Sequence, residues 1–264
     1  MPAEDLAAID IHGHLGPYRG SGHDLTDAFY SGDARVVVER ARKARTALTV
    51  VSSLKALLPR QGADPLTGNA ETADAIAAWD ELCQWAVVDP LKPETYSQAL
   101  DMLVSPKCVG VKIHPEEHGY PIREHGRKIF EFAETHDIVL QSHSGDKNSM
   151  PADFLTLVND FPGVRIIIAH LGYAWDGDMT HQVRALAASK HGNLFSDTSS
   201  AKQITSGFLE WAVRELGADR ILYGTDTPLY FAPMQRSRID QADLRAGEKQ
   251  AILRDNARRL LRLP

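Results

Sequence analysis

The sequence predicts an α/β protein folded as a single (β/α)8 barrel that takes in residues 1–264 as one domain. Short apolar runs alternate with helical segments along the whole chain, and eight such runs can be recognised. No linker or break in composition divides them. Eight strand–helix units in about 250 residues are typical of a parallel barrel with helices outside. An open, doubly wound sheet is the alternative, because the number of strands does not prove closure.

The strands are expected where apolar and β-branched residues cluster between turn signals. The first contains Ala8, Ile9 and Ile11 and is followed by a glycine-rich loop over 13–32. Asp89 and Pro90 end the third strand. The seven later strands are expected over 47–52, 84–88, 108–113, 138–142, 165–169, 193–197 and 220–224.

Helices are expected between these strands, where the apolar residues recur at helical spacing. Pro93 suits the first turn of the third helix, and a loop over 59–68 precedes the second. The expected helices span 33–44, 71–82, 93–104, 122–135, 151–160, 179–189, 206–216 and 247–261.

The composition is that of an ordinary globular protein and excludes several classes of function. The formal net charge of -6 provides no electrostatic footprint for a nucleic acid or an anionic membrane. The N-terminal residues lack the pattern of a secretory signal, and no apolar run approaches the ~20 residues of a membrane span. We therefore expect a cytoplasmic protein that acts on a small molecule, with no nucleic-acid or membrane partner. The composition is also compatible with a homo-oligomer.

His12 and His14 follow the apolar residues of the first strand. Because they are two residues apart, their side chains leave the same face of a strand and form a candidate pair of metal ligands. An isolated pair of this kind is more simply explained as a polar strand end. Here, however, His114, His143, His170 and Asp226 follow the fourth, fifth, sixth and eighth strands. The carboxyl ends of barrel strands open on one face, so these residues are predicted to converge there.

Three motifs resemble the amidohydrolase superfamily: IDIHGH near the start, IAHLG late in the chain and YGTDTP on the last expected strand. They are most similar to its amidohydrolase 2 branch of metal-dependent hydrolases and non-oxidative decarboxylases, which includes aminocarboxymuconate-semialdehyde decarboxylase. The segment 255–261 resembles the terminal helix of that branch. This resemblance implies a distorted (β/α)8 TIM barrel over 1–264 that binds a divalent metal, most often zinc.

By the same resemblance His12, His14, His143 and Asp226 match the metal ligands, and His170 matches the histidine that handles protons. Three imidazoles and one carboxylate suit zinc or a similar transition ion better than magnesium or calcium. Asp226 can both bind the metal and take a proton, so His170 and Asp226 are the expected catalytic residues.

Lys112 and His114 are two residues apart and share a face of the fourth strand. Binuclear members of the superfamily carry a carboxylated lysine at the end of this strand, bridging two metals, with the histidines of the fifth and sixth strands on the second ion. The mononuclear branch is the nearer match. One ion is therefore favoured over two, with Lys112 and His114 facing the substrate. A lysine that extends from the barrel rim to solvent is the simpler alternative for Lys112.

The leading functional hypothesis is a metal-dependent hydrolase of a small ester, lactone or amide that uses metal-activated water. The alternative is a non-oxidative decarboxylase of an unsaturated or aromatic carboxylic acid. A decarboxylase needs a cation for the substrate carboxylate. Arg19, Lys147 and Arg60 in the strand-end loops are candidates, with Arg19 preferred, although a solvated loop charge explains each of them as well. A non-catalytic barrel would be expected to have lost a ligand, and none is missing.

Overall fold

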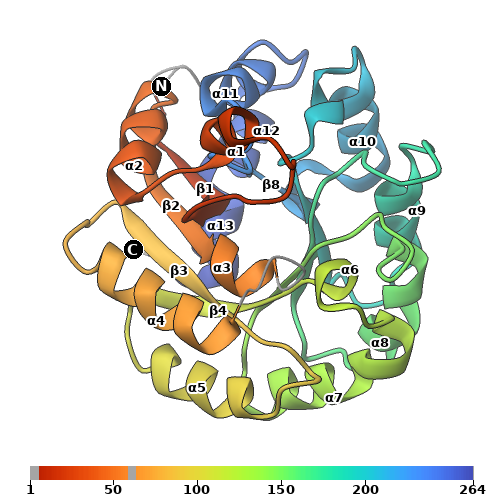
Figure 1. The fold of residues 1–264 in the computed structure, drawn as a ribbon. Helices are drawn as coiled ribbons and strands as arrows, with labels where there is room; N and C mark the ends of the chain where they lie inside the picture. Colours follow the sequence, from red (N-terminus) through yellow and green to blue (C-terminus); the bar gives the residue numbers. More distant parts are fainter. Residues whose placement is uncertain (1–5, 59–63, 264) are drawn as a thin grey trace.

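The computed structural model describes residues 6–58 and 64–263, and in these residues eight parallel strands follow one another in chain order (Figure 1). The predicted (β/α)8 barrel is confirmed, and all eight expected strands are present. They are β1 Ala8–Leu15, β2 Thr46–Ser53, β3 Leu82–Val87, β4 Cys108–Ile113, β5 Leu140–Ser142, β6 Ile166–Ile168, β7 Leu194–Asp197 and β8 Ile221–Leu222.

The sheet closes through the segment that follows β8. Each strand pairs in parallel with the next one along the chain, from β1 to β8. The Ile11 N–H then donates to the Tyr223 carbonyl at 3.0 Å, and the Asp226 N–H donates to the His12 carbonyl at 2.7 Å. These bonds join the first strand to the last, so the sheet forms a nearly closed barrel and not an open sheet.

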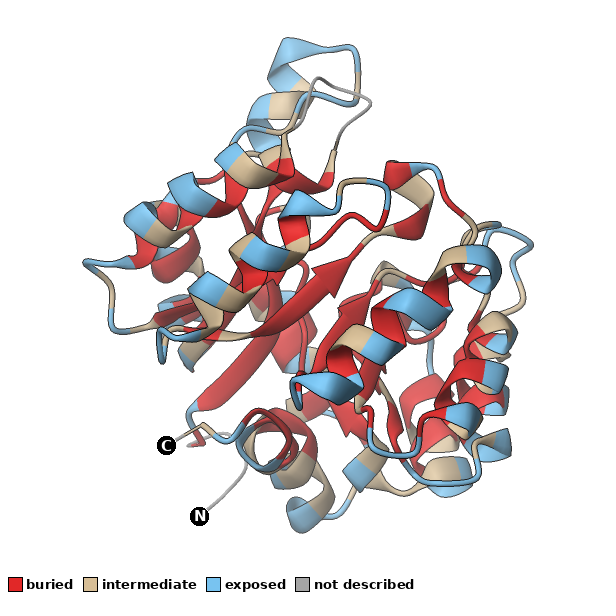
Figure 2. Ribbon diagram, turned by 90° about the horizontal axis from the view of Figure 1, so that it is seen from below, coloured by how far each residue is buried: buried red, intermediate tan, exposed pale blue. Residues whose placement is uncertain are grey.

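The helices bury one side against the barrel and expose the other. In α7 (Ile122–Thr135) the buried residues include Ile122, Ile129, Phe130 and Ala133, which recur at helical spacing. The strands themselves are buried nearly throughout, as Figure 2 shows. Each large apolar side chain removed from water in this way contributes about 1.5–3 kcal/mol.

Most of the outer helices lie close to their expected positions, apart from the second. That helix begins at Pro65, six residues before the expected start, because Asp64 caps it by accepting from the Leu66 N–H. The expected loop before it falls partly on residues 59–63, which lie outside the described residues. The helices are α2 Ala34–Lys43, α4 Pro65–Ile76, α5 Glu94–Leu103, α7, α8 Phe154–Asp160, α9 His181–Ala188, α10 Phe208–Leu216, α12 Ala246–Gln250 and α13 Asn256–Leu261. A π-helical turn over Ala251–Asp255 joins the last two.

Four helices were not expected from the sequence: α1 Asp24–Tyr30, α3 Leu54–Leu57, α6 Pro115–His118 and α11 Ala232–Asp240. The helices α3 and α6 are single turns, too short to show periodicity. Helix α11 buries Gln235 and Arg236 beside Ala232 and Ile239, so no apolar stripe marks it. Short 3₁₀ turns cover Pro151–Asp153, Ala201–Ile204 and Ala218–Arg220. Across the described ranges, no helix combines the length and apolar character needed to cross a membrane.

Candidate metal centre and active site

A cavity of about 320 Å³ opens at the carboxyl ends of the strands. Its size falls within the lower range for small-molecule sites. All the site residues expected from the sequence line it except Arg19, namely His12, His14, Lys112, His114, His143, His170 and Asp226. The strand-end rule therefore identified side chains that do converge, although they are up to 214 positions apart in the chain.

His12, His14 and Asp226 form the first group of possible metal ligands. One ligand atom from each lies within 4.8 Å of the others, and all three residues are buried. His14 Nε2 is 2.8 Å from Asp226 Oδ1, and His12 Nε2 is 3.6 Å from the same oxygen. Both histidines lie on β1 two residues apart. Side chains at this spacing leave the same face of a strand, which allows both to contribute to one group.

The surroundings set the protonation of this group in the way that metal ligation requires. Burial lowers the pKa of His14, which favours the neutral ring. Burial alone raises the pKa of Asp226, but the hydrogen bond from His14 and the nearby histidines outweigh it and bring the pKa well below its ordinary value. A neutral His14 ring beside an ionised Asp226 carboxylate is the form in which these two residues bind a divalent ion.

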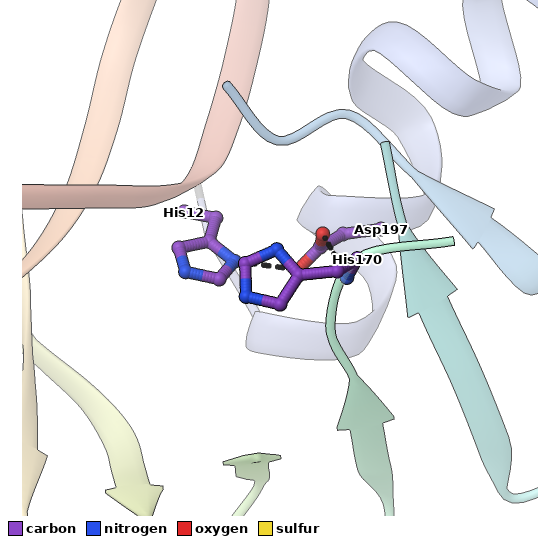
Figure 3. A group of neighbouring side chains, drawn as sticks. All are labelled: His12, His170 and Asp197. Atoms are coloured by element: carbon purple, nitrogen blue, oxygen red, sulfur yellow. Dashed lines mark hydrogen bonds and ion pairs between the residues drawn. The ribbon is translucent and has the colours of Figure 1, made fainter. Parts of the chain in front are cut away.

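A second group consists of His12, His170 and Asp197 (Figure 3). Asp197 Oδ2 accepts from His12 Nδ1 at 2.9 Å, and Asp197 Oδ1 accepts from the backbone N–H of His170 at 3.1 Å. A carboxylate on Nδ1 leaves Nε2 of His12 as the nitrogen available for a metal. Sequence analysis missed Asp197, although it ends the seventh expected strand and the strand-end rule would have included it.

His143 turns toward His170 and lies outside both groups. Its Nδ1 is 3.0 Å from His170 Nε2, and its Nε2 donates to Asp146 Oδ2 at 2.7 Å. The Tyr173 hydroxyl donates to the other oxygen of Asp146 at 3.0 Å. The structure therefore brings three of the four expected ligands together and places the fourth beside them, with Nδ1 as its inward nitrogen. Asp146 was not identified from the sequence, because its role depends on the geometry of the loop after β5.

Lys112 and His114 extend from β4 into the same cavity. Lys112 Nζ is buried, 3.1 Å from His12 Nε2 and 3.2 Å from Gln141 Oε1, and burial lowers the pKa of Lys112 to about 8. The alternative in which Lys112 extends from the barrel rim to solvent is therefore wrong. The His114 ring stacks on His143 with centroids 4.2 Å apart. Its Nδ1 accepts from the Glu117 N–H at 3.2 Å, which leaves Nε2 as the donor.

The loop cations proposed for a substrate carboxylate do not gather at the cavity. Arg19 is exposed in the loop after β1. Lys147 lies with Nζ 4.7 Å from the centre of the Trp175 ring. Arg60 lies outside the described residues. Lys112 is the single cation among the described side chains that line the cavity.

The donor set fits a divalent transition metal. It offers imidazole nitrogens and a carboxylate, which is the mixture that zinc and manganese accept. The outward nitrogens are held by partners within the protein, Asp197 for His12 and Ser52 Oγ for His14 at 3.0 Å. Such partners orient the ring and raise its basicity toward a metal.

Comparisons with known proteins agree with this fold. The family described as amidohydrolase matches residues 9–263. No curated protein matches the chain. This family and the two His/Asp groups together support a divalent metal at the cavity.

Several solved structures share the fold over their whole length. Two of them are 2,6-dihydroxybenzoate decarboxylase from Rhizobium, with 14% identity over 97% of this chain and 98% of that chain and a TM-score of 0.70, and 5-carboxyvanillate decarboxylase from Sphingomonas paucimobilis, with 14% identity over 98% and 100% and a TM-score of 0.71. A third is a dihydroxybenzoic acid decarboxylase from Polaromonas sp. JS666 with bound manganese and 2-nitroresorcinol, with 14% identity over 97% of each chain and a TM-score of 0.74. At this identity the likeness establishes the fold alone.

Proposed function

The chain belongs to the amidohydrolase family, and we propose that it is a metal-dependent, non-oxidative decarboxylase of an aromatic or unsaturated carboxylic acid. The decarboxylase, which is the alternative hypothesis from the sequence, is thus favoured over the hydrolase. Structural neighbours that cover 97–98% of the chain are named as decarboxylases of 2,6-dihydroxybenzoate, 5-carboxyvanillate and dihydroxybenzoic acid, and the last of them is described with manganese. They support this reaction class over hydrolysis.

The observation that carries the proposal is the mixed lining of the cavity. The histidines, Asp226 and Lys112 line it together with an apolar group, Leu54, Leu57 and Leu58, from α3 and the residue after it. A planar acid fits this arrangement with its ring against the leucines and its carboxylate toward Lys112. An apolar wall also excludes water from the carbon that must be protonated.

We propose that His12, His14, His143 and Asp226 hold one divalent ion. When bound, that ion supplies positive charge that orients the acid and stabilises the negative charge formed as carbon dioxide leaves. The sequence motifs favour zinc, whereas manganese is the ion named for the Polaromonas neighbour. Metal analysis of the purified protein distinguishes these ions from each other and one ion per chain from two.

His170 is the proposed proton donor, with Asp226 as the group that takes up or returns the proton. The bond between the ring carbon and the carboxyl carbon breaks, and its electron pair stays on the ring carbon. His170 Nε2 takes up a proton and passes it to that carbon, which completes the product. The carboxylate and one proton thus give the decarboxylated product and carbon dioxide.

The test is a set of hydroxybenzoic and unsaturated acids incubated with the metal-loaded protein in deuterium oxide. We expect release of carbon dioxide and one deuterium on the carbon that lost it. The His170→Asn protein, loaded with the same metal, is the control for proton transfer. Release of product without carbon dioxide, or no turnover of any acid beside turnover of an ester, contradicts the proposal.

Hydrolysis of a small ester, lactone or amide is the second candidate, and Lys112 is the observation that favours it. Its buried Nζ lies 3.1 Å from His12 Nε2, on the strand where the resemblance places the carboxylated lysine of two-metal hydrolases. Two metals per chain, a modified Lys112 in the intact mass, and solvent oxygen-18 in the product would together favour the hydrolase.

A further inference from the structure

We propose that Ser199 is a positioning residue that fixes which ring nitrogen of His170 carries the proton. Ser199 follows β7, is fully buried, and has no place in the set of residues expected from the sequence. The assignment concerns the state of His170 in the protein. It rests on the proposed function only where it bears on the reaction.

The Ser199 hydroxyl lies between two polar groups. Its Oγ is hydrogen-bonded to Asp197 Oδ1 and lies 2.8 Å from His170 Nδ1. The same Asp197 oxygen accepts from the backbone N–H of His170 at 3.1 Å and from that of Ser199 at 3.0 Å. Dashed lines in Figure 3 join the carboxylate of Asp197 to the His12 ring and to the backbone of His170.

The direction of these bonds follows from the number of hydrogens. An oxygen that accepts from two backbone N–H groups is poorly placed to carry a proton itself, so Asp197 Oδ1 accepts from Ser199 as well. A hydroxyl has a single hydrogen, and Ser199 gives it to Asp197. Its oxygen can therefore only accept from His170 Nδ1, which must carry the hydrogen.

The opposite nitrogen of His170 is then the one that exchanges protons. His170 Nε2 faces His143 Nδ1 at 3.0 Å, and His143 holds its own hydrogen on Nε2 through Asp146. His170 Nε2 and His143 Nδ1 thus both present a lone pair, and the space between these two atoms favours a proton or a cation. Without Ser199 the Nδ1–H of His170 would lose its acceptor, and the ring could place its hydrogen on either nitrogen.

The experiment is nitrogen-15 NMR of histidine-labelled protein in a Zn²⁺ buffer, chosen because Zn²⁺ is diamagnetic. Comparison with the His170→Asn spectrum assigns the two ring nitrogens of His170. We expect a protonated Nδ1 and an unprotonated Nε2 in the wild-type protein. In Ser199→Ala the hydrogen should move to Nε2 or be shared, and Ser199→Thr, which keeps the hydroxyl, should restore the wild-type pattern.

Ser196→Ala is the matched control, because Ser196 lies on β7 and is as buried as Ser199, but its hydroxyl donates to the Ile168 carbonyl at 2.7 Å. A structural role alone would lower the melting temperature in both alanine variants and leave the His170 pattern unchanged. That result, or a wild-type His170 that already carries its hydrogen on Nε2, overturns the assignment, and the second observation needs no variant.

The positioning role and the proposed function fail in different ways. If decarboxylation occurs, Ser199→Ala should reduce turnover by about 10- to 100-fold, as is usual for residues that orient a functional histidine. If the His170 pattern changes as expected and no acid is decarboxylated, the positioning role stands and the proposed function is wrong.

Discussion

At the scale of single residues, the site is defined by which nitrogen each histidine turns inward. His12 and His143 each give one ring nitrogen to a carboxylate, Asp197 and Asp146 respectively. His170 has a left-handed backbone, with φ of 66°, which is uncommon for a residue other than glycine. Strained backbone of this kind costs about 1–3 kcal/mol and persists where the surroundings hold it. The ring of His170 is thus placed by its neighbours.

His143 and His170 both end strands, and the roles proposed for them differ. We expect His170→Asn to keep nearly all of the metal and to lose about 10²- to 10⁴-fold in turnover, the usual contribution of a positioned proton-transfer group. His143→Asn should lose metal affinity together with turnover. Metal analysis of the two purified variants decides between the roles. A metal-depleted His170→Asn protein would make His170 a ligand and favour the two-metal arrangement with Lys112.

Asp146 and Ser199, which sequence analysis missed, share a physical reason. Each acts through a histidine, and the nitrogen that it holds depends on the geometry of the loops. Ser199 and His170, for example, are 29 positions apart. The strand-end rule found the histidines because position along a strand is visible in the sequence. The sequence does not show which side chains pair across the mouth of the barrel.

At the scale of elements, α4 positions the apolar wall of the cavity by packing closely on α3. A Cβ at Gly68 of α4 would lie 2.6 Å from the Ala56 nitrogen and 2.9 Å from the Ala56 Cβ. The next residue, Asn69, is buried and bonds both the N–H and the carbonyl of Val87 in β3, at 2.8 and 2.9 Å. The helix is therefore fixed to the barrel and to α3 at once.

Gly68→Ala should destabilise the protein by about 1–3 kcal/mol, because the added methyl overpacks backbone that cannot move aside. Gly247→Ala is the matched control. Gly247 lies in α12, is exposed, and has no atom within 4 Å of the new Cβ. At this position the higher helix propensity of alanine relative to glycine should stabilise the protein by up to ~1 kcal/mol. Urea unfolding of both variants measures the difference. Equal effects at the two sites would show that α4 has room beside α3.

A partly buried ion pair connects α10 to α11, one of the four helices that the sequence did not reveal. Arg238 donates to both carboxylate oxygens of Glu210, at 3.0 and 2.7 Å, and these bonds lower the pKa of Glu210 from 4.5 to about 2. Because the pKa is lower in the folded state, the stabilisation is fully present above about pH 4.5. It is lost as the pH falls toward 2.

Glu210→Gln should therefore cost about 1–2 kcal/mol of unfolding free energy at pH 7, and the difference from wild type should shrink between pH 5 and pH 2. Glu248→Gln is the control, because its partner Arg245 is exposed and solvent screens that pair. Urea unfolding at several pH values provides the measurement. A Glu210→Gln difference that stays constant with pH would contradict the assigned ion pair.

At the scale of the whole molecule, the candidate metal site connects the first strand of the barrel to the segment that follows the last strand. The fold is predictable because eight apolar runs with turn signals repeat regularly, and the run over 108–113, for example, forms β4 with the same bounds. The helix α11 was not predictable, because it buries Gln235 and Arg236 in place of an apolar stripe. His14 comes from the first strand and Asp226 from the segment after the last, 212 positions later. An ion bound by both residues would therefore join β1 to the segment that follows β8.

Removing the metal should consequently weaken the entire barrel as well as abolish turnover. A ligand present at one hundred times its dissociation constant stabilises the folded state by about 2.7 kcal/mol. For a chain of this size that corresponds to roughly 5–10 °C in melting temperature. We expect a chelator to lower the melting temperature of the wild-type protein by this amount, and added zinc, manganese or cobalt to restore both the temperature and the turnover. Asp226→Asn, which lacks the carboxylate of the first group, should melt at a temperature that barely responds to chelator or metal. A wild-type melting temperature that is independent of both would show that no tight ion joins β1 to the segment after β8, and the decarboxylase would then have to operate without one.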